Sequence, residues 1–140
     1  MGKPKKEWIN TYRQVLTAQE KALKFLKTTT VLGRELDAVA RNYFKTLKLD
    51  KHFIHSLGHG IGKWIHQSPR ISPKAKHQLV KPGDVVTIEP GLYFKNRFGI
   101  RIEDTVVKTK TGFKYLTYFP KNLSSVTITS WEQKKPYHRT

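Results

Sequence analysis

The sequence predicts a single α+β domain, because two helical segments come first and strand-like segments separated by glycine and proline turns follow. The chain has 140 residues, which is about the length of one domain and long enough to bury a core. Neither an internal repeat nor a low-complexity tract divides it. We expect one domain over residues 1–123 and a basic C-terminal tail over residues 124–140.

The first third of the chain predicts two amphipathic helices. Apolar residues recur at helical spacing from Trp8 to Leu26, which predicts a helix over residues 5–27 with its Lys- and Gln-rich face toward water. The same spacing from Leu36 to Leu47 predicts a second helix of about 14 residues. Glu35 stands near its N-terminus, where the helix dipole favours an acid.

The remainder of the chain is rich in β-branched residues and turn residues. It predicts strands over residues 85–89, 92–94, 100–108 and 114–118. Lys110, Thr111 and Gly112 have the composition of a hairpin turn between the last two strands. Beyond Leu123 the sequence predicts a frayed tail.

The charge balance favours contact with anions without specifying one. Lys and Arg number 27 and Asp and Glu 10, which gives a formal net charge of +17. The basic residues are spread along the chain and form no nucleic-acid recognition motif, so we expect non-specific polyanion binding. No apolar run long enough for a membrane span or signal peptide is present, and we expect a cytoplasmic protein without membrane contact.

Five residues stand out as candidates for metal chemistry. Because the chain has no cysteine, imidazole and carboxylate groups would have to hold any metal. They are three histidines and two glutamates: His55, His59, His66, Glu89 and Glu103. Taken singly, each also has a structural explanation: a packed histidine, a turn contact for Glu89, and an ion pair with a neighbouring arginine for Glu103.

The motifs around these residues resemble those of one metallopeptidase family, which includes prolidase, aminopeptidase P, creatinase and methionine aminopeptidase. The resemblance covers about residues 5–123 and rests on three ordered segments: His55-Ser56-Leu57-Gly58-His59-Gly60-Ile61-Gly62 with His66, Gly83 to Tyr93, and Gly99 to Val106. Arg101-Ile102-Glu103-Asp104 is similar to the prolidase and aminopeptidase P branch. The implied fold is the C-terminal part of a pita-bread domain, with two helices on a curved, mainly antiparallel sheet.

The resemblance also implies an activity and a role for each candidate residue. His59, Glu89 and Glu103 would bind metal, and Glu89 would also serve as a general acid/base. His55 and His66 would act on the substrate, and Arg101 would orient it. The reaction would be hydrolysis of the amide bond before a proline at the second position of a peptide, with water activated by two divalent ions. Manganese or cobalt suits such a site best, and zinc and iron are also compatible.

Two metal-binding aspartates of the family have no counterpart in this chain. They would lie upstream of the first helix, and neither Asp84 nor Asp104 replaces them, so we expect a truncated enzyme that holds at most one ion weakly and has little activity alone. Gln67 also stands where the family has an acid beside His66.

A truncated chain would expose a sheet edge, which favours a homo-oligomer or a complementing N-terminal half as partner. The alternative function is a non-catalytic binding module for an acidic partner or a nucleic acid.

Overall fold

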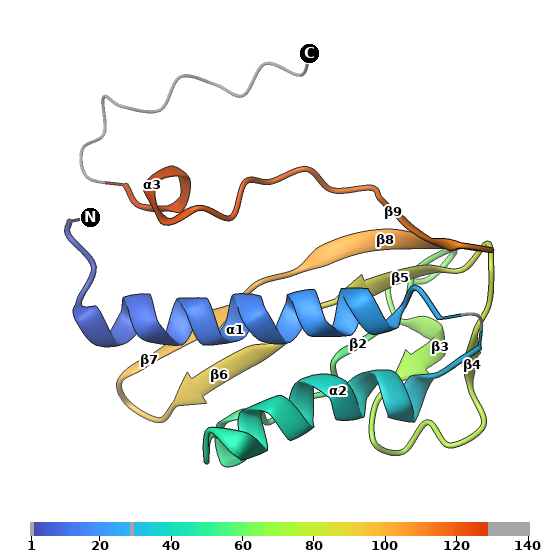
Figure 1. The fold of residues 1–140 in the computed structure, drawn as a ribbon, viewed down its shortest axis with the longest axis horizontal. Helices are drawn as coiled ribbons and strands as arrows, with labels where there is room; N and C mark the ends of the chain where they lie inside the picture. Colours follow the sequence, from blue (N-terminus) through green and yellow to red (C-terminus); the bar gives the residue numbers. More distant parts are fainter. Residues whose placement is uncertain (1, 29, 129–140) are drawn as a thin grey trace.

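The computed structural model describes residues 2–28 and 30–128, in which helices pack against antiparallel strands (Figure 1). The helical elements are α1 (Lys6–Phe25), α2 (Gly33–Thr46), the 3-10 turn η1 (Asp50–His52) and α3 (Leu123–Val126). The strands are β1 (Val31–Leu32), β2 (Gly58–Gly60), β3 (Gln67–Ile71), β4 (Leu79–Val80), β5 (Val85–Ile88), β6 (Gly91–Phe94), β7 (Phe98–Arg101), β8 (Asp104–Thr109) and β9 (Gly112–Tyr115).

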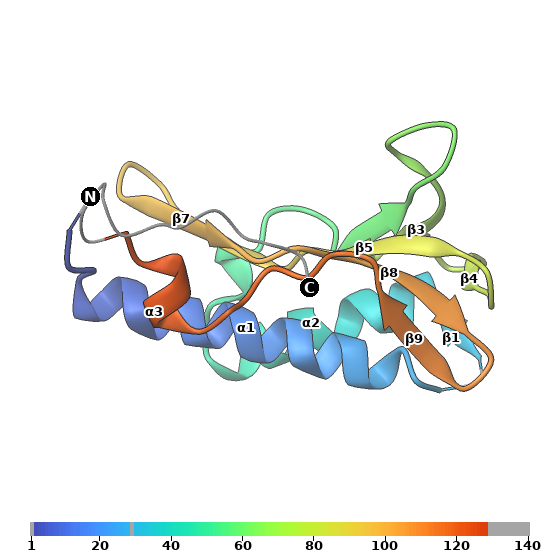
Figure 2. The same cartoon turned by 90° about the horizontal axis from the view of Figure 1, so that it is seen from above.

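The described strands form one five-stranded sheet and two strand pairs. The large sheet has the order β3-β2-β5-β8-β9, and the pairs are β6-β7 and β1-β4. Every pairing in them is antiparallel. Figure 2 shows α1 and α2 together on one side of the strands. The predicted α+β class and mainly antiparallel sheet are therefore confirmed.

Residues 100–108 do not form the single strand that the sequence predicts, so this prediction is wrong. β7 ends at Arg101 and pairs with β6, whereas β8 begins at Asp104 and pairs with β5 and β9. At the break, the Ile102 amide donates to the Pro90 carbonyl (3.3 Å). The chain thus passes from one sheet to the other at Ile102 and Glu103, and burial still alternates across the break.

Other boundaries differ in detail from those predicted. The two main helices and the hairpin at residues 110–112 are confirmed. The short strands β3 and β4 were not predicted, since their pairing depends on distant partners. The expected tail begins with α3, where Asn122 caps the helix by accepting from the Ser125 amide (2.8 Å), and residues 129–140 of that tail lie outside the described residues.

The core lies between the helices and the sheet. Its buried apolar side chains come from both layers and include Val15, Ala22, Leu36, Phe44, Leu57, Ile88 and Val106. Burial of this surface is the main source of stability in a fold of this kind. Among the described residues, no helix combines the length and apolarity that crossing a lipid bilayer requires.

A buried lysine closes the C-terminal end of α1. The Lys108 side chain on β8 is 1% exposed, and its Nζ donates to the carbonyls of Leu26 and Thr28 (both 2.8 Å). These carbonyls follow the last turn of the helix, where partners are otherwise lacking. Burial lowers the pKa of Lys108 below its ordinary value.

Candidate metal centre

His59 and Glu89 meet where β2 lies beside β5. The His59 Nε2 lies 3.3 Å from a carboxylate oxygen of Glu89, and the two side chains are 13% and 12% exposed. The other ring nitrogen, Nδ1, lies 3.0 Å from the Gly60 carbonyl. Since a carbonyl can only accept, Nδ1 carries a proton, and Nε2 is the ring nitrogen that faces the carboxylate. A cation between this nitrogen and the carboxylate, whether a proton or a metal ion, would stabilise the arrangement.

Thr87, a residue that was not predicted, fixes this pair. Its hydroxyl donates to the Glu89 carboxylate (3.1 Å), and the same oxygen accepts from the His59 amide (3.1 Å). Thr87 and Glu89 are two residues apart and share a side of the strand end. Gly58 permits the close approach, because a Cβ there would collide with the Thr87 carbonyl. The glycine before His59 therefore lets the two strands bring their side chains together.

Glu103 joins this pair through an arginine. Arg101 lies 3.6 Å from the Glu89 carboxylate and 3.8 Å from that of Glu103, and the Arg101 and Glu103 side chains are 49% and 41% exposed. The ion pair expected as the structural role of Glu103 is thus present. Within residues 2–28 and 30–128, no three His, Asp or Glu side chains are grouped closely enough to hold a metal ion. The described residues therefore fit a fraction of a metal site and do not complete one.

His66 lies beside His59 at the end of a tight turn. The two imidazole rings have centroids 4.2 Å apart. Gln67 stabilises the turn. Its side-chain oxygen accepts a hydrogen bond from the Trp64 amide (3.3 Å), and its side chain occupies the space next to Gly62. In this chain Gln67 thus organises the backbone that leads to His66.

His55 has a separate setting. Its Nδ1 lies 2.8 Å from the Ser56 carbonyl, and its Nε2 lies 3.1 Å from the Tyr93 hydroxyl. By the same reasoning as for His59, Nδ1 carries the proton, so Nε2 accepts from Tyr93. These are the polar contacts of the His55 ring within the described part of the chain, so His55 is not joined directly to the His59–Glu89 pair.

An ion pair on α2 holds the loop that carries His55. Arg41 forms a double contact with Asp37 (2.8 and 3.1 Å) and donates to the carbonyls of Phe53 (3.1 Å) and His55 (3.0 Å). The buried Asp37 also accepts from the Leu57 amide (3.0 Å). This loop therefore depends on one pair of charged side chains from the second helix.

Gln19 connects α1 to both glutamate-bearing segments. Its amide group donates to the carbonyls of Ile88 (3.0 Å) and Ile102 (3.2 Å), the residues immediately before Glu89 and Glu103. The expectation that the Gln-rich face of this helix points to water is wrong for Gln19, whose side chain is 1% exposed.

Comparison with known proteins agrees with this fold. The sequence profile of Metallopeptidase family M24 matches residues 1–110, and the chain belongs to this family, whose fold is the pita-bread fold and whose members use divalent metal ions.

The chain is 42% identical over 123 residues to the Xaa-Pro dipeptidase of Pyrococcus furiosus, which covers 88% of this chain and 35% of that protein. The chain also matches the solved structures of two relatives. The X-Pro aminopeptidase of Thermotoga maritima has a TM-score of 0.81 and 41% identity, with coverage of 87% of this chain and 34% of that one. The Xaa-Pro dipeptidase of Bacillus anthracis has a TM-score of 0.82 and 37% identity, with coverage of 88% and 34%. The chain therefore spans about a third of the length of these relatives.

Proposed function

We propose that this chain supplies part of the active site of an X-Pro peptidase, with His59, Glu89 and Glu103 among its metal ligands. The observation that carries the proposal is the His59–Glu89 pair, in which the imidazole Nε2 lies 3.3 Å from a carboxylate oxygen. Relatives named as X-Pro peptidases support the substrate class: a peptide with proline at its second position.

The metal site needs donors beyond those that the described residues bring together. Glu103 is linked to the pair through Arg101, and two carboxylates cannot neutralise two divalent ions. We therefore propose that the remaining donors come from protein outside this chain, and that the chain alone hydrolyses X-Pro peptides weakly. Manganese or cobalt is the proposed metal, which when bound would polarise the substrate carbonyl and activate water.

The chain's own side chains would orient the reacting groups. Thr87 holds the Glu89 carboxylate, and Gly60 fixes the His59 tautomer. Arg101 lies at the exposed edge of the pair, where it can meet the carboxylate of a short peptide. His55 and His66 are proposed to contact the substrate, and Glu89 is proposed to transfer the proton.

A chimera tests the proposal. This chain would replace the matching segment of the Pyrococcus furiosus Xaa-Pro dipeptidase, and hydrolysis of an X-Pro dipeptide would be measured with manganese or cobalt. We expect an active chimera and weak turnover by the chain alone. His59→Ala in the chimera should cost more than the roughly 100-fold that loss of a ligand's hydrogen-bond partner costs.

The matched control is His77→Ala, since His77 is exposed and lies outside the candidate site. This substitution should leave the chimera's turnover unchanged. A chimera that folds but is inactive would contradict the proposal. So would a chimera whose activity does not depend on His59 and Glu89, or full turnover by the chain alone.

A further inference from the structure

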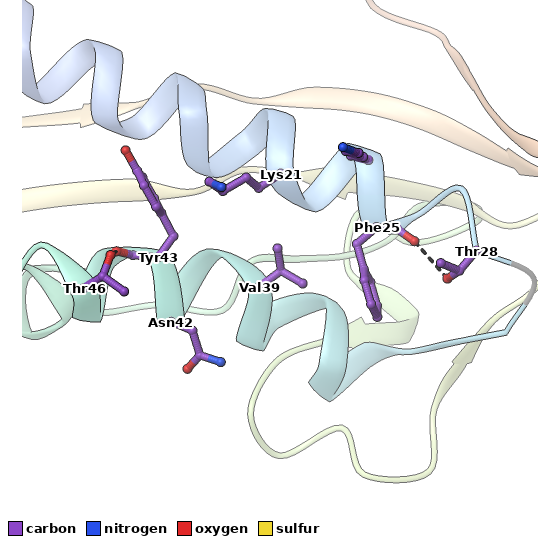
Figure 3. A pocket seen from close by; sticks show the side chains of 8 residues that line it. Lys21, Phe25, Thr28, Val39, Asn42, Tyr43 and Thr46 are labelled. Carbon is purple, nitrogen blue, oxygen red and sulfur yellow. Dashed lines mark hydrogen bonds between the residues drawn. The ribbon is translucent and has the colours of Figure 1, made fainter.

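A groove lies between α1 and α2, away from the residues of the candidate metal centre. It has a volume of about 790 Å³. Figure 3 shows side chains from both helices around it, with Phe25 from α1 and Val39 and Tyr43 from α2 among its apolar members. These three side chains are partly exposed, so the groove offers apolar surface to a ligand.

The charged residues that line this groove are all basic. Lys21 and Lys24 are exposed, and neither lies within 4.0 Å of a carboxylate of the described chain. The Lys21 amine lies 5.4 Å from the centre of the Tyr43 ring. An apolar floor bordered by two lysines is complementary to a ligand that combines apolar side chains with carboxylates.

The walls of the groove favour a helical ligand over an extended one. Both walls are α-helices, whose interior backbone groups are already hydrogen-bonded within each helix. An extended peptide would find few backbone partners there, whereas a helix satisfies its own backbone and binds through side chains. The 14 residues of α2 provide about 21 Å of wall, which matches a ligand helix of similar length.

We propose that the α1–α2 groove binds an acidic amphipathic helix of a partner protein. Its apolar stripe would cover Val39 and Tyr43, and its carboxylates would pair with Lys21 and Lys24. A second copy of this chain is a poor occupant, because two molecules each carrying a formal charge of +17 repel one another. This interaction would be independent of the proposed peptidase site.

The test uses a fluorescein-labelled, stapled helical peptide with leucine at the i, i+3, i+4 and i+7 positions and glutamate elsewhere. Fluorescence anisotropy of this probe with the 140-residue chain should show saturable binding. Two matched probes, one with lysine in place of glutamate and one with serine in place of leucine, should bind at least about tenfold more weakly.

Two variants locate the binding. The charge reversal K21E/K24E should weaken binding of the acidic probe at least about tenfold. K3E/K6E makes the same change in net charge near the N-terminal end of α1 and should leave binding of this probe unchanged. V39R fills the groove while adding positive charge. General electrostatic attraction would therefore make V39R bind more tightly, and the proposal requires that it bind more weakly. Circular dichroism checks that each variant is folded.

Several results would overturn the proposal. They are the absence of saturable binding, equal loss in K3E/K6E and K21E/K24E, and tighter binding by V39R. Sedimentation of the chain alone adds a further one: a dimer that K21E/K24E converts to monomer would identify a second copy as the occupant. None of these outcomes bears on His59 or Glu89, so the peptidase proposal is tested separately.

Discussion

His55 and His59 occupy one short motif and share a tautomer, yet their Nε2 atoms face opposite kinds of partner. In each ring Nδ1 is bonded to the carbonyl of the next residue, at 2.8 Å for His55 and 3.0 Å for His59. The Nε2 of His55 accepts a hydrogen bond from the Tyr93 hydroxyl, whereas that of His59 faces the Glu89 carboxylate. Both ring nitrogens of His55 therefore have partners in Ser56 and Tyr93, whereas His59 would gain from a cation beside Glu89.

The two histidines are also held differently. His59 lies on β2, between neighbours β3 and β5, where the sheet and Thr87 fix its backbone. The His55 loop is fixed by the Asp37–Arg41 pair on α2. Disturbing one histidine should thus leave the other in place, and this separation can be tested.

Loss of Asp37 should have the largest effect on stability. Asp37→Ala removes the acceptor of the Leu57 amide and the carboxylate that pairs with Arg41, and should reduce the free energy of unfolding by about 3 kcal/mol, measured by denaturant titration. The NMR signals of His55 should shift while those of His59 stay close to their original positions. Equal shifts at both rings would show that they are not held independently. Glu35→Ala, an exposed change in the first turn of the same helix, is the control and should cost no more than about 1 kcal/mol, the contribution of an acid to the helix dipole there.

Loss of Gln19 should disturb the segments that carry Glu89 and Glu103, and not the His55 loop. Gln19→Met keeps the side-chain volume but leaves the carbonyls of Ile88 and Ile102 without this donor, at a cost of about 2 kcal/mol. In NMR spectra of Gln19→Met, the signals of Glu89 and Glu103 should shift more than those of His55. If the free energy of unfolding of Gln19→Met equalled that of the parent chain, the two hydrogen bonds would make no net contribution to stability. The control is Asn10→Ala, on the exposed side of α1.

Lys108 provides a basic side chain that is already satisfied, in contrast to His59. Lys108→Met should cost about 1 to 2 kcal/mol near neutral pH, because it removes the donor from the Leu26 carbonyl. The lowered pKa means that the folded state binds fewer protons than the unfolded state as pH rises toward 10.5, so Lys108 makes stability increase over this range.

The variant should lose that increase, which thermal unfolding at several pH values would detect. Measurements are best kept below pH 10.0, the ordinary pKa of tyrosine, because burial raises the pKa of Tyr12 and Tyr115 and makes stability fall at higher pH. The same slope with pH in both proteins would contradict the assignment to Lys108.

Tyr93 should have the smallest effect. Tyr93→Phe removes one hydrogen bond to His55 and should cost about 1 kcal/mol. The imidazole nitrogen shifts of His55 should change, with those of His59 unaffected. The counterpart Thr87→Val removes the hydroxyl beside His59 and Glu89 and should produce the reverse pattern. An identical pattern in the two variants would remove the distinction between the histidines.

The sequence was sufficient where structure depends on local spacing. The apolar period predicted both main helices. The end of one strand at Arg101 and the start of the next at Asp104 could not be predicted, because alternation continues through the break and only the partners change.

In the candidate site, too, the residues in local motifs could be predicted and those that act through distant contacts could not. Its histidines and glutamates lie in recognisable motifs, but Thr87 and Gln19 act through contacts with residues that are distant in sequence. Glutamine on a helix that also carries exposed lysines gives little local indication of burial, and its two acceptors are visible only when α1 lies against the strands. The Arg101 contacts likewise depend on how β7 meets the end of β5.

The most direct test of the central claim is a zinc titration of the chain followed by NMR of the imidazole nitrogens. We expect the His59 Nε2 signal to move on binding of a single weakly held ion, while the signal of the His55 Nε2, which is bonded to the Tyr93 hydroxyl, does not. Glu89→Gln should weaken the response of His59. Movement of His55 at the same zinc concentration, or no movement of His59 at any concentration that leaves the chain folded, would contradict the claim.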